Sequence, residues 1–284
     1  MAAPQFILTL SCPDTVGIVH AISGVLVTQS CNIIDSAQFG DPGANRFFMR
    51  VTFAAPAGVS RAAMESTFVA TAKRFAMDLR IHEAAAKTRT LILVSRFGHC
   101  LNDLMFRAGS GTLAIDVAGV ASNHGDFADL AAGHHIPFHH LPVTAANKAE
   151  QEAQLLALID SLGVELVVLA RYMQVLSNDL CRALSGRAIN IHHSFLPSFK
   201  GAKPYHQAYE RGVKLVGATA HYVTPDLDEG PIIEQEAIRV DHAMGPDHLV
   251  EVGRDVECVV LSRAVKLHVE HRVLLNGSRT VVFR

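Results

Sequence analysis

The chain has 284 residues, of which 49% are hydrophobic and 18% are charged, and its formal net charge is -2 at pH 7. This composition excludes a disordered or fibrous protein, and the length accommodates two domains at a prior of roughly 150 residues each. A net charge close to zero provides no general field that would attract nucleic acid or an anionic membrane, so we expect neither as a partner.

The cysteines and the first residues indicate a reducing compartment. The number of cysteines is odd, and none of them forms a CxxC pair: Cys12, Cys31, Cys100, Cys181 and Cys258. We therefore expect free thiols rather than a disulfide framework or a zinc ribbon. Residues 1–4 lead directly into a strand-like segment, without the basic flank and apolar stretch of a signal peptide or membrane span. We expect a cytoplasmic protein.

The first eighty residues alternate between strand and helix patterns. Apolar periodicity predicts strands over residues 6–11, 32–39, 45–53 and 77–82, and helices over residues 16–26 and 61–75. Asp14 and Thr15 are predicted to cap the first helix. The order βαββαβ predicts a ferredoxin-like sandwich, in which two helices cover four antiparallel strands.

A small and polar stretch around residue 86 separates this segment from a different pattern, so we expect one domain over 1–85 and another over 86–284. Strands are predicted over 89–95, 112–122, 136–141, 165–170 and 188–192, with helices near 100–107, 127–132, 148–162 and 177–184. A final pair of strands, 215–222 and 232–238, precedes a long helix over 246–271. The alternation predicts an α/β fold with a doubly wound, mostly parallel sheet and helices on both faces.

Three polar side chains are predicted to meet at one edge of this sheet. Asn190 and His192 alternate at the end of a strand, so both project to the same side, where ligands of such sheets gather. Asp228 lies in the loop between the final two strands, in a stiff corner where Gly230 is able to adopt positive φ. An amide, an imidazole and a carboxylate at one point can polarise a carbonyl and move a proton, which indicates acyl transfer or hydrolysis.

The other histidines and the thiols give weaker evidence of a functional site. The doublets His134-His135 and His139-His140 flank a short strand, where neighbouring residues point to opposite faces, so each doublet offers one ligand to a given site. We therefore predict no metal site. Cys100 lies near a helix start, where a thiolate is favoured, but no base is adjacent, and we expect a spectator thiol.

The polar cluster lies within longer motifs. Residues 190–198 read Asn-Ile-His-His-Ser-Phe-Leu-Pro-Ser, and residues 227–231 read Leu-Asp-Glu-Gly-Pro. They resemble the signature of the folate-dependent formyltransferases, and with Gly-Ala-Lys-Pro-Tyr-His-Gln-Ala at 201–208 and Gly-Ala-Thr-Ala-His-Tyr-Val-Thr at 217–224 the chain is most similar to the formyltetrahydrofolate deformylase family. The resemblance implies that Asn190, His192 and Asp228 are the catalytic set. It also implies that the folate pteridine is held by Arg171, Tyr172, Met173, Gln174, Val175 and Leu176.

The same resemblance implies a reaction in which 10-formyltetrahydrofolate and water give formate and tetrahydrofolate, with no cofactor beyond this substrate. Its product would supply purine synthesis and balance the one-carbon folate pools. Asp228 would orient and deprotonate water, while Asn190 and His192 stabilise the oxyanion. A nearby carboxylate such as Asp228 would favour the cationic form of His192.

The N-terminal segment resembles an ACT domain, a small amino-acid-binding module. The resemblance rests on Ser-Cys-Pro-Asp-Thr-Val-Gly-Ile-Val at 11–19 and on Asn-Ile-Ile-Asp at 32–35. It implies that Asp14, Gly17, Ile18 and Asn32 line an effector site at a subunit interface, with methionine or glycine as the effector. It also implies a homo-oligomer.

Two alternatives remain open at this stage. Glycinamide ribonucleotide formyltransferases use the same three residues, but hold a phosphate with a Gly-x-Gly-Ser-Asn-Leu loop; here the loop after the first strand of the second domain reads Ser-Arg-Phe-Gly-His-Cys-Leu over 95–101. Water therefore fits better as the acceptor, although Arg96 can still bind an anion. The other alternative is an inactive amino-acid-binding regulator, against which the joint presence of Asn190, His192 and Asp228 argues.

Overall fold

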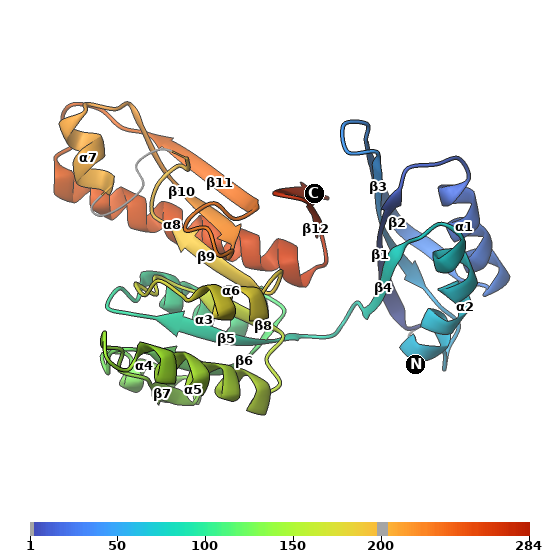
Figure 1. Cartoon of the computed structure of the whole chain (residues 1–284), viewed down its shortest axis with the longest axis horizontal. Coiled ribbons are helices and arrows are strands. Elements are labelled where there is room, and N and C mark those ends of the chain that lie inside the picture. Colours follow the sequence, from blue (N-terminus) through green and yellow to red (C-terminus); the bar gives the residue numbers. More distant parts are fainter. Residues whose placement is uncertain (1–2, 198–203) are drawn as a thin grey trace. The chain divides into compact units, whose positions relative to one another are not determined.

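The structure is a computed structural model, which describes residues 3–197 and 204–284 (Figure 1). The last serine of the Ser-x-Leu-Pro-Ser motif, Ser198, and the Gly-Ala-Lys segment at 201–203 lie outside the described residues.

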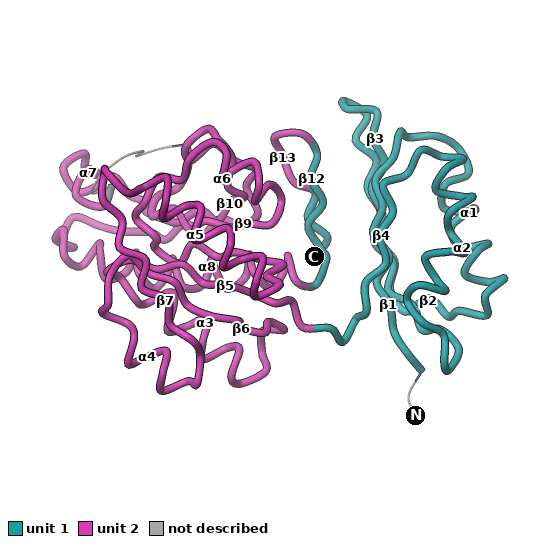
Figure 2. Tube along the Cα trace, turned by 60° about the horizontal axis from the view of Figure 1, so that its bottom comes forward, with its two compact units in different colours: residues 1–86, 270–276, 281–284 teal, residues 87–269, 277–280 magenta. Residues whose placement is uncertain are grey.

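The chain divides into two compact units (Figure 2). The first comprises Met1–Ala86 together with Glu270–Asn276 and Val281–Arg284, and the second comprises Lys87–Val269 with Gly277–Thr280. The expected continuous domain over 86–284 is therefore wrong at its C-terminal end. Two observations explain the return of the chain: buried Val281 and Phe283 pack against Phe48, and the Arg50 guanidinium donates to the Glu270 carbonyl.

The first unit has the predicted βαββαβ order. Its elements are β1 (Gln5–Pro13), α1 (Ile18–Thr28), β2 (Asn32–Asp41), β3 (Arg46–Ala54), α2 (Arg61–Arg74) and β4 (Asp78–Glu83). The strands form one antiparallel sheet in the order β2-β3-β1-β4. Alternate apolar residues of β1 and β3, such as Leu8 and Val51, pack against Ile22 of α1 and Phe68 of α2, so one face of the sheet carries the core.

The start of α1 differs from the sequence-based prediction. The helix begins at Ile18, and its N-cap is Gly17 at φ 96°, without a side-chain cap. Asp14 and Thr15 therefore do not cap it; the backbone N–H of Asp14 donates instead to the Asn45 carbonyl. A left-handed turn at Gly17 is accessible because glycine has no Cβ.

The second unit contains the remaining elements. They are β5 (Thr88–Val94), α3 (His99–Gly109), β6 (Ile115–Ser122), α4 (Ala128–Gly133), β7 (Phe138–His140), α5 (Lys148–Ser161), β8 (Leu166–Leu169), α6 (Asn178–Ala183), β9 (Ala188–His192), α7 (Pro204–Glu210), β10 (Leu215–Tyr222), β11 (Ile232–Arg239) and α8 (Pro246–Val269). The sheet order is β11-β10-β9-β8-β5-β6-β7. The five strands from β9 to β7 are parallel, whereas β10 and β11 pair antiparallel. The mostly parallel sheet is confirmed, with a mixed edge.

Three elements were missed. They are α7 and the two strands β12 (Val273–Asn276) and β13 (Arg279–Val282), which pair with each other. The predicted long helix ends at Val269 rather than residue 271, because the chain then turns into β12. Asn276-Gly277 between two apolar runs is a strong hairpin signal, and it identifies β12 and β13 when it is applied here.

The order of the strands indicates where a ligand would bind to this sheet. From β5 the chain proceeds to β6 and β7, and then returns to β8 on the other side of β5. Open α/β sheets bind ligands outside the carboxyl ends of their strands at such a reversal. Right-handed crossovers put the helices of the two halves on opposite faces, and α5 covers the face that carries Leu91 and Leu93. In the part of the chain that the structure describes, every helix is too short or too polar to cross a bilayer.

Candidate active site

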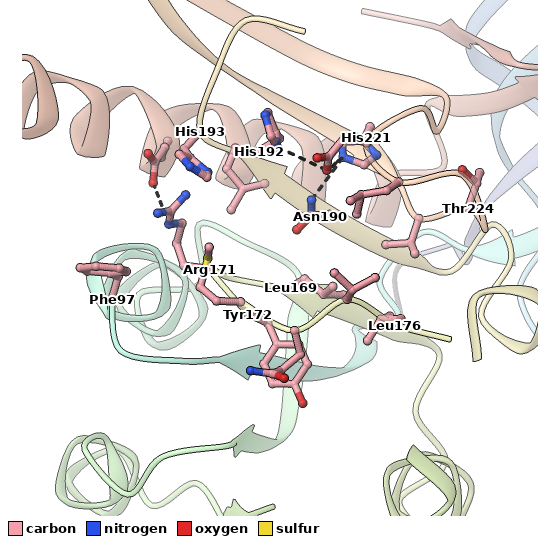
Figure 3. A pocket seen from close by; sticks show the side chains of 18 of the residues that line it. Phe97, Leu169, Arg171, Tyr172, Leu176, Asn190, His192, His193, His221 and Thr224 are labelled. Carbon is pink, nitrogen blue, oxygen red and sulfur yellow. Dashed lines mark hydrogen bonds and ion pairs between the residues drawn. The ribbon is translucent and has the colours of Figure 1, made fainter. Parts of the chain in front are cut away.

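A cavity of about 970 Å³ lies at the carboxyl ends of β5, β8 and β9 (Figure 3). It is lined by Phe97 and His99 after β5, by the whole segment 171–176 after β8, by Asn190–His193, and by Asp228. The cavity thus brings together Asn190, His192, Asp228 and the six residues expected to hold the pteridine.

His192 and Asp228 form the centre of the site. The His192 Nδ1 atom lies 3.3 Å from Asp228 Oδ1, and both side chains are largely buried. Burial raises the pKa of Asp228, but the hydrogen bond from His192 and the electrostatic interaction with the surrounding histidines, that with His192 being the largest, outweigh it and hold this pKa below its usual value. Asp228 is therefore ionised at neutral pH. Among the described residues the buried Nε2 atom of His192 has no hydrogen-bond partner, which leaves it available to a substrate atom.

The corner that carries Asp228 has its positive φ, of 57°, at Asp228 and not at Gly230. A Cβ atom at Gly230 would instead collide with the carbonyl oxygen of Tyr222. Gly230 is needed for this close approach, which presses the loop against β10. A left-handed non-glycine residue costs about 1–3 kcal/mol, so the surrounding packing must hold Asp228 in place.

His221 is a site residue that sequence reasoning missed. It pairs with Asn190 across β10 and β9, and its Nε2 atom lies 3.2 Å from the Asn190 amide nitrogen and 3.8 Å from Asp228 Oδ1. The Nδ1 atom faces the Tyr222 carbonyl at 2.9 Å, so Nδ1 carries the proton. Burial lowers the pKa of His221, and the neutral ring accepts a hydrogen bond from Asn190 through Nε2. This contact orients the Asn190 amide.

The segment 171–176 connects β8 to α6 without regular structure, and its backbone is fixed by Ser95. The Ser95 N–H donates to the Arg171 carbonyl at 3.2 Å, and Ser95 Oγ accepts from the Met173 N–H at 2.9 Å. Met173 and Val175 are about half exposed and provide an apolar wall. A flat heterocycle can pack on such a wall while it bonds to main-chain groups.

A buried polar cluster forms one end of the cavity. The Glu257 side chain, 1% exposed, lies 2.7 Å from His99 Nε2, accepts from the Tyr205 hydroxyl at 2.9 Å and ion-pairs with Arg171 Nε at 3.4 Å. Burial raises the pKa of Glu257, but the hydrogen bond from His99 and the charge of Arg171 outweigh it and hold this pKa below its usual value. Glu257 is therefore ionised. No sequence motif indicated this cluster, since its members come from four separate segments.

His99, Cys100 and Glu257 also lie close enough together to be metal ligands. The hydrogen bond with Cys258 and burial raise the pKa of Cys100, so its thiol stays protonated and is a poor ligand. The cation beside Glu257 is the guanidinium of Arg171. These donors therefore fit an arginine better than a metal ion.

The remaining candidates lie elsewhere. His139 packs against Gly119, and His134 and His135 are exposed at the end of α4. In the first unit Asp14, Gly17 and Asn32 are exposed, whereas Ile18 is buried in the core. The structure therefore leaves three of the four expected effector residues accessible.

The second unit is similar to a known class of enzyme domain. Residues 88–265 match the family model described as formyl transferase, which spans the β5–α8 region that builds the cavity. Glycinamide ribonucleotide transformylase 1 from Symbiobacterium toebii has a related structure, with a TM-score of 0.66 and 30% identity over 70% of this chain and 95% of that chain. The second unit is therefore a formyl transferase domain.

More similar proteins match nearly the whole chain. The formyltetrahydrofolate deformylase of Corynebacterium sp. (strain P-1) is 56% identical over 281 residues, covering 99% of this chain and 98% of that protein. The enzyme of the same name from Bacillus subtilis (strain 168) is 46% identical over 279 residues, covering 97% and 93%. The crystal structure of the Burkholderia mallei deformylase has a TM-score of 0.95 at 56% identity, covering 99% and 100%. The chain belongs to the formyltetrahydrofolate deformylase family.

Proposed function

We propose that the chain hydrolyses 10-formyltetrahydrofolate to formate and tetrahydrofolate, which makes it a hydrolase of one-carbon folate metabolism. The observation that carries this proposal is the convergence of Asn190, His192 and ionised Asp228 in one large cavity of a deformylase-family chain. The apolar wall at 173–176 is suited to the pteridine ring, and Asp228 lies among the groups that face the same cavity. The formate would feed purine synthesis.

In the proposed mechanism Asp228 accepts a hydrogen bond from water and removes its proton as the water oxygen bonds to the formyl carbon. The formyl oxygen becomes an oxyanion, which takes hydrogen bonds from the amide of Asn190 and from the otherwise unpartnered Nε2 of His192. The carbon–nitrogen bond then breaks, its electron pair passes to the N10 nitrogen, and this nitrogen takes up the proton that Asp228 removed from water. This mechanism requires no cofactor.

Water is preferred over a phosphorylated amine as the acceptor. Phe97 and His99 follow β5 and line the cavity. A glycine-rich phosphate loop would occupy this position, and it would need exposed main-chain N–H groups there rather than large side chains. The same side chains contact Arg171 and Glu257. A phosphorylated sugar would have to displace them.

Formate release from 10-formyltetrahydrofolate by the purified protein tests the proposal. Asp228→Asn, which keeps the size of the side chain, should lower kcat by about 10²-fold or more. No release by the wild type, or an unchanged rate in Asp228→Asn, would contradict the assignment. Faster formyl transfer to glycinamide ribonucleotide than to water would identify a transferase instead.

We also propose that the first unit is an ACT-type module that binds an amino acid, methionine or glycine, and pairs with its copy in a homo-oligomer. The edge strand β2 supports pairing, because Ile33, Ile34 and Phe39 on it are 39%, 51% and 46% exposed. Asp14, Gly17 and Asn32 are accessible for an effector, with Ile18 beneath them in the core. The five free cysteines fit a reducing compartment, and we place the protein in the cytoplasm.

The molar mass of the full chain in solution, measured by light scattering with and without each amino acid, tests this second proposal. A monomer under all conditions would exclude pairing. Formate release that is insensitive to methionine and to glycine would exclude both as effectors.

A further inference from the structure

Arg171 is a buried cation whose hydrogen-bonding capacity is largely unused. Its side chain is about one-tenth exposed, and its Nε and Nη1 atoms are buried without a hydrogen-bond partner among the described residues. Unpaired buried donors are costly, and a guanidinium in such a position needs an explanation. Figure 3 shows the guanidinium on the cavity wall, beside His193 and Phe97.

The surrounding residues fix the position of Arg171 but do not accept hydrogen bonds from its Nε and Nη1 atoms. Glu257 lies 3.4 Å from Nε as an ion pair, but His99 and the Tyr205 hydroxyl occupy its two carboxylate oxygens. The Arg171 backbone is left-handed, with φ 66°, and its carbonyl is fixed by the Ser95 N–H. Strained backbone of this kind persists where the surrounding structure enforces it, frequently at ligand sites.

The local charge favours an anion. Arg171 and Arg254 lie 5.5 and 5.6 Å from the ring centre of Phe97, so two guanidinium groups accompany the one carboxylate of Glu257. His193 stands between this cluster and the catalytic residues, with its ring centre 5.1 Å from that of His192. Burial and the electrostatic interactions with Arg171 and His192 lower the pKa of His193 to about 3. His193 therefore stays neutral, and Arg171 carries the positive charge at this position.

We propose that Arg171 binds the formate that the reaction produces. This inference rests on the proposed function, because hydrolysis converts a neutral formyl group into a small carboxylate in the same cavity. After the carbon–nitrogen bond breaks, the proton that Asp228 took from water passes to N10, so Asp228 is ionised again, and formic acid loses its own proton to solvent water and becomes formate. The negative charge of Asp228 then repels formate, while the guanidinium of Arg171 offers the planar N–H donors that bind carboxylates well.

Binding of formate alone tests the inference without turnover. Sodium formate should raise the Tm of the wild type above the Tm in sodium chloride at equal ionic strength. In Arg171→Gln the affinity for formate should fall by about 10-fold or more. Arg254→Gln is the matched control, because it removes the same charge at the same Phe97 ring but from an exposed position, so its loss of affinity for formate should be several times smaller than that of Arg171→Gln.

Product inhibition gives a second measurement and a second variant. Arg171→Lys keeps the charge and most of the packing, and it should raise the inhibition constant for formate severalfold, and by more than it raises that for tetrahydrofolate. No protection of the wild type by formate, or equal formate affinity in the wild type and both Arg171 variants, would overturn the inference. An equal loss in Arg254→Gln would also overturn it. Absence of formate release by the wild type would count against the proposed function instead, since the binding measurement needs no folate.

Discussion

His221 and Asn190 face each other across the antiparallel pair of β10 and β9, and the neutral His221 ring accepts a hydrogen bond from the Asn190 amide. One amide N–H of Asn190 is therefore used to fix its orientation, and the other is left for substrate. In this way a residue that need not touch the substrate controls one of the proposed oxyanion donors.

Replacement of His221 should therefore act on the chemical step. In His221→Phe the Asn190 amide loses its partner and its orientation, and we expect kcat to fall by about 10-fold while KM changes less than threefold. His221→Gln, which keeps an acceptor, should lie between this variant and the wild type. Steady-state kinetics of formate release measures both values. A change confined to KM would show that His221 supports binding rather than the oxyanion.

Gly230→Ala should damage the corner that carries Asp228. The new methyl group would collide with the Tyr222 carbonyl, so the loop must move away from β10. We expect the free energy of unfolding to fall by about 2–3 kcal/mol and kcat to fall with it, because Asp228 is displaced from His192. Gly125→Ala is the matched control, because a Cβ there meets open space. Equal Tm values for both variants would contradict this account.

His82 should make the stability of the first unit sensitive to mild acid. It stacks on His271 with ring centres 3.5 Å apart, and burial and nearby arginines lower its pKa from 6.5 to about 4. Below pH 6.5 the unfolded chain takes up a proton at this position that the folded protein does not. The free energy of unfolding therefore decreases as the pH is lowered from 6.5 to about 4. Since the side chain is half-buried, we expect a loss of about 1 kcal/mol between pH 7 and pH 5.

The comparison of wild type with His82→Phe measures this contribution. Chemical unfolding of both proteins at pH 7 and at pH 5 should give a smaller decrease for the variant. An identical pH dependence would show that the His82–His271 stack has no part in it.

The C-terminal residues should be part of the folding core of the first unit. Phe283 is 7% exposed and packs with Phe48 and Val281. Phe283→Ala should lower the free energy of unfolding by about 3 kcal/mol, through the lost apolar contact and the cavity that remains. Thermal unfolding measures the change, and Leu275→Ala, at an exposed position, should cost much less. A chain as stable as the wild type after loss of the Phe283 ring would exclude this packing.

The sequence predicted the regular parts of this fold well because they depend on local patterns. The strand over 188–192 was predicted with its observed bounds, and continuous apolar runs located β5 and β8 within a few residues. The alternation of side chains along the strand 188–192 also predicted that Asn190 and His192 lie on the same side of the sheet. Asp228 was singled out from the loop between the last two predicted strands, whereas the segment 171–176 came from the family resemblance, and both line one cavity.

The missed parts depend on long-range relationships. His221 becomes a site residue through the register of β10 against β9, which no local pattern reveals. Glu257 of α8 meets Arg171, which follows β8, through an ion pair between segments more than eighty residues apart in the sequence. In the Asp228 corner the glycine is required by the nearby Tyr222 carbonyl rather than by positive φ, which falls at Asp228, and no local pattern reveals that close approach.

The return of residues 270–276 and 281–284 to the first unit means that the catalytic unit is inserted within the other one, rather than appended to it. Proteolytic cleavage between residues 86 and 87 would therefore leave two fragments joined by the packing of Phe48 with Val281 and Phe283. Truncation at that point would strip the N-terminal fragment of part of its core. A clean separation requires a rearranged gene, in which residues 270–284 are fused through a short linker to residues 1–86.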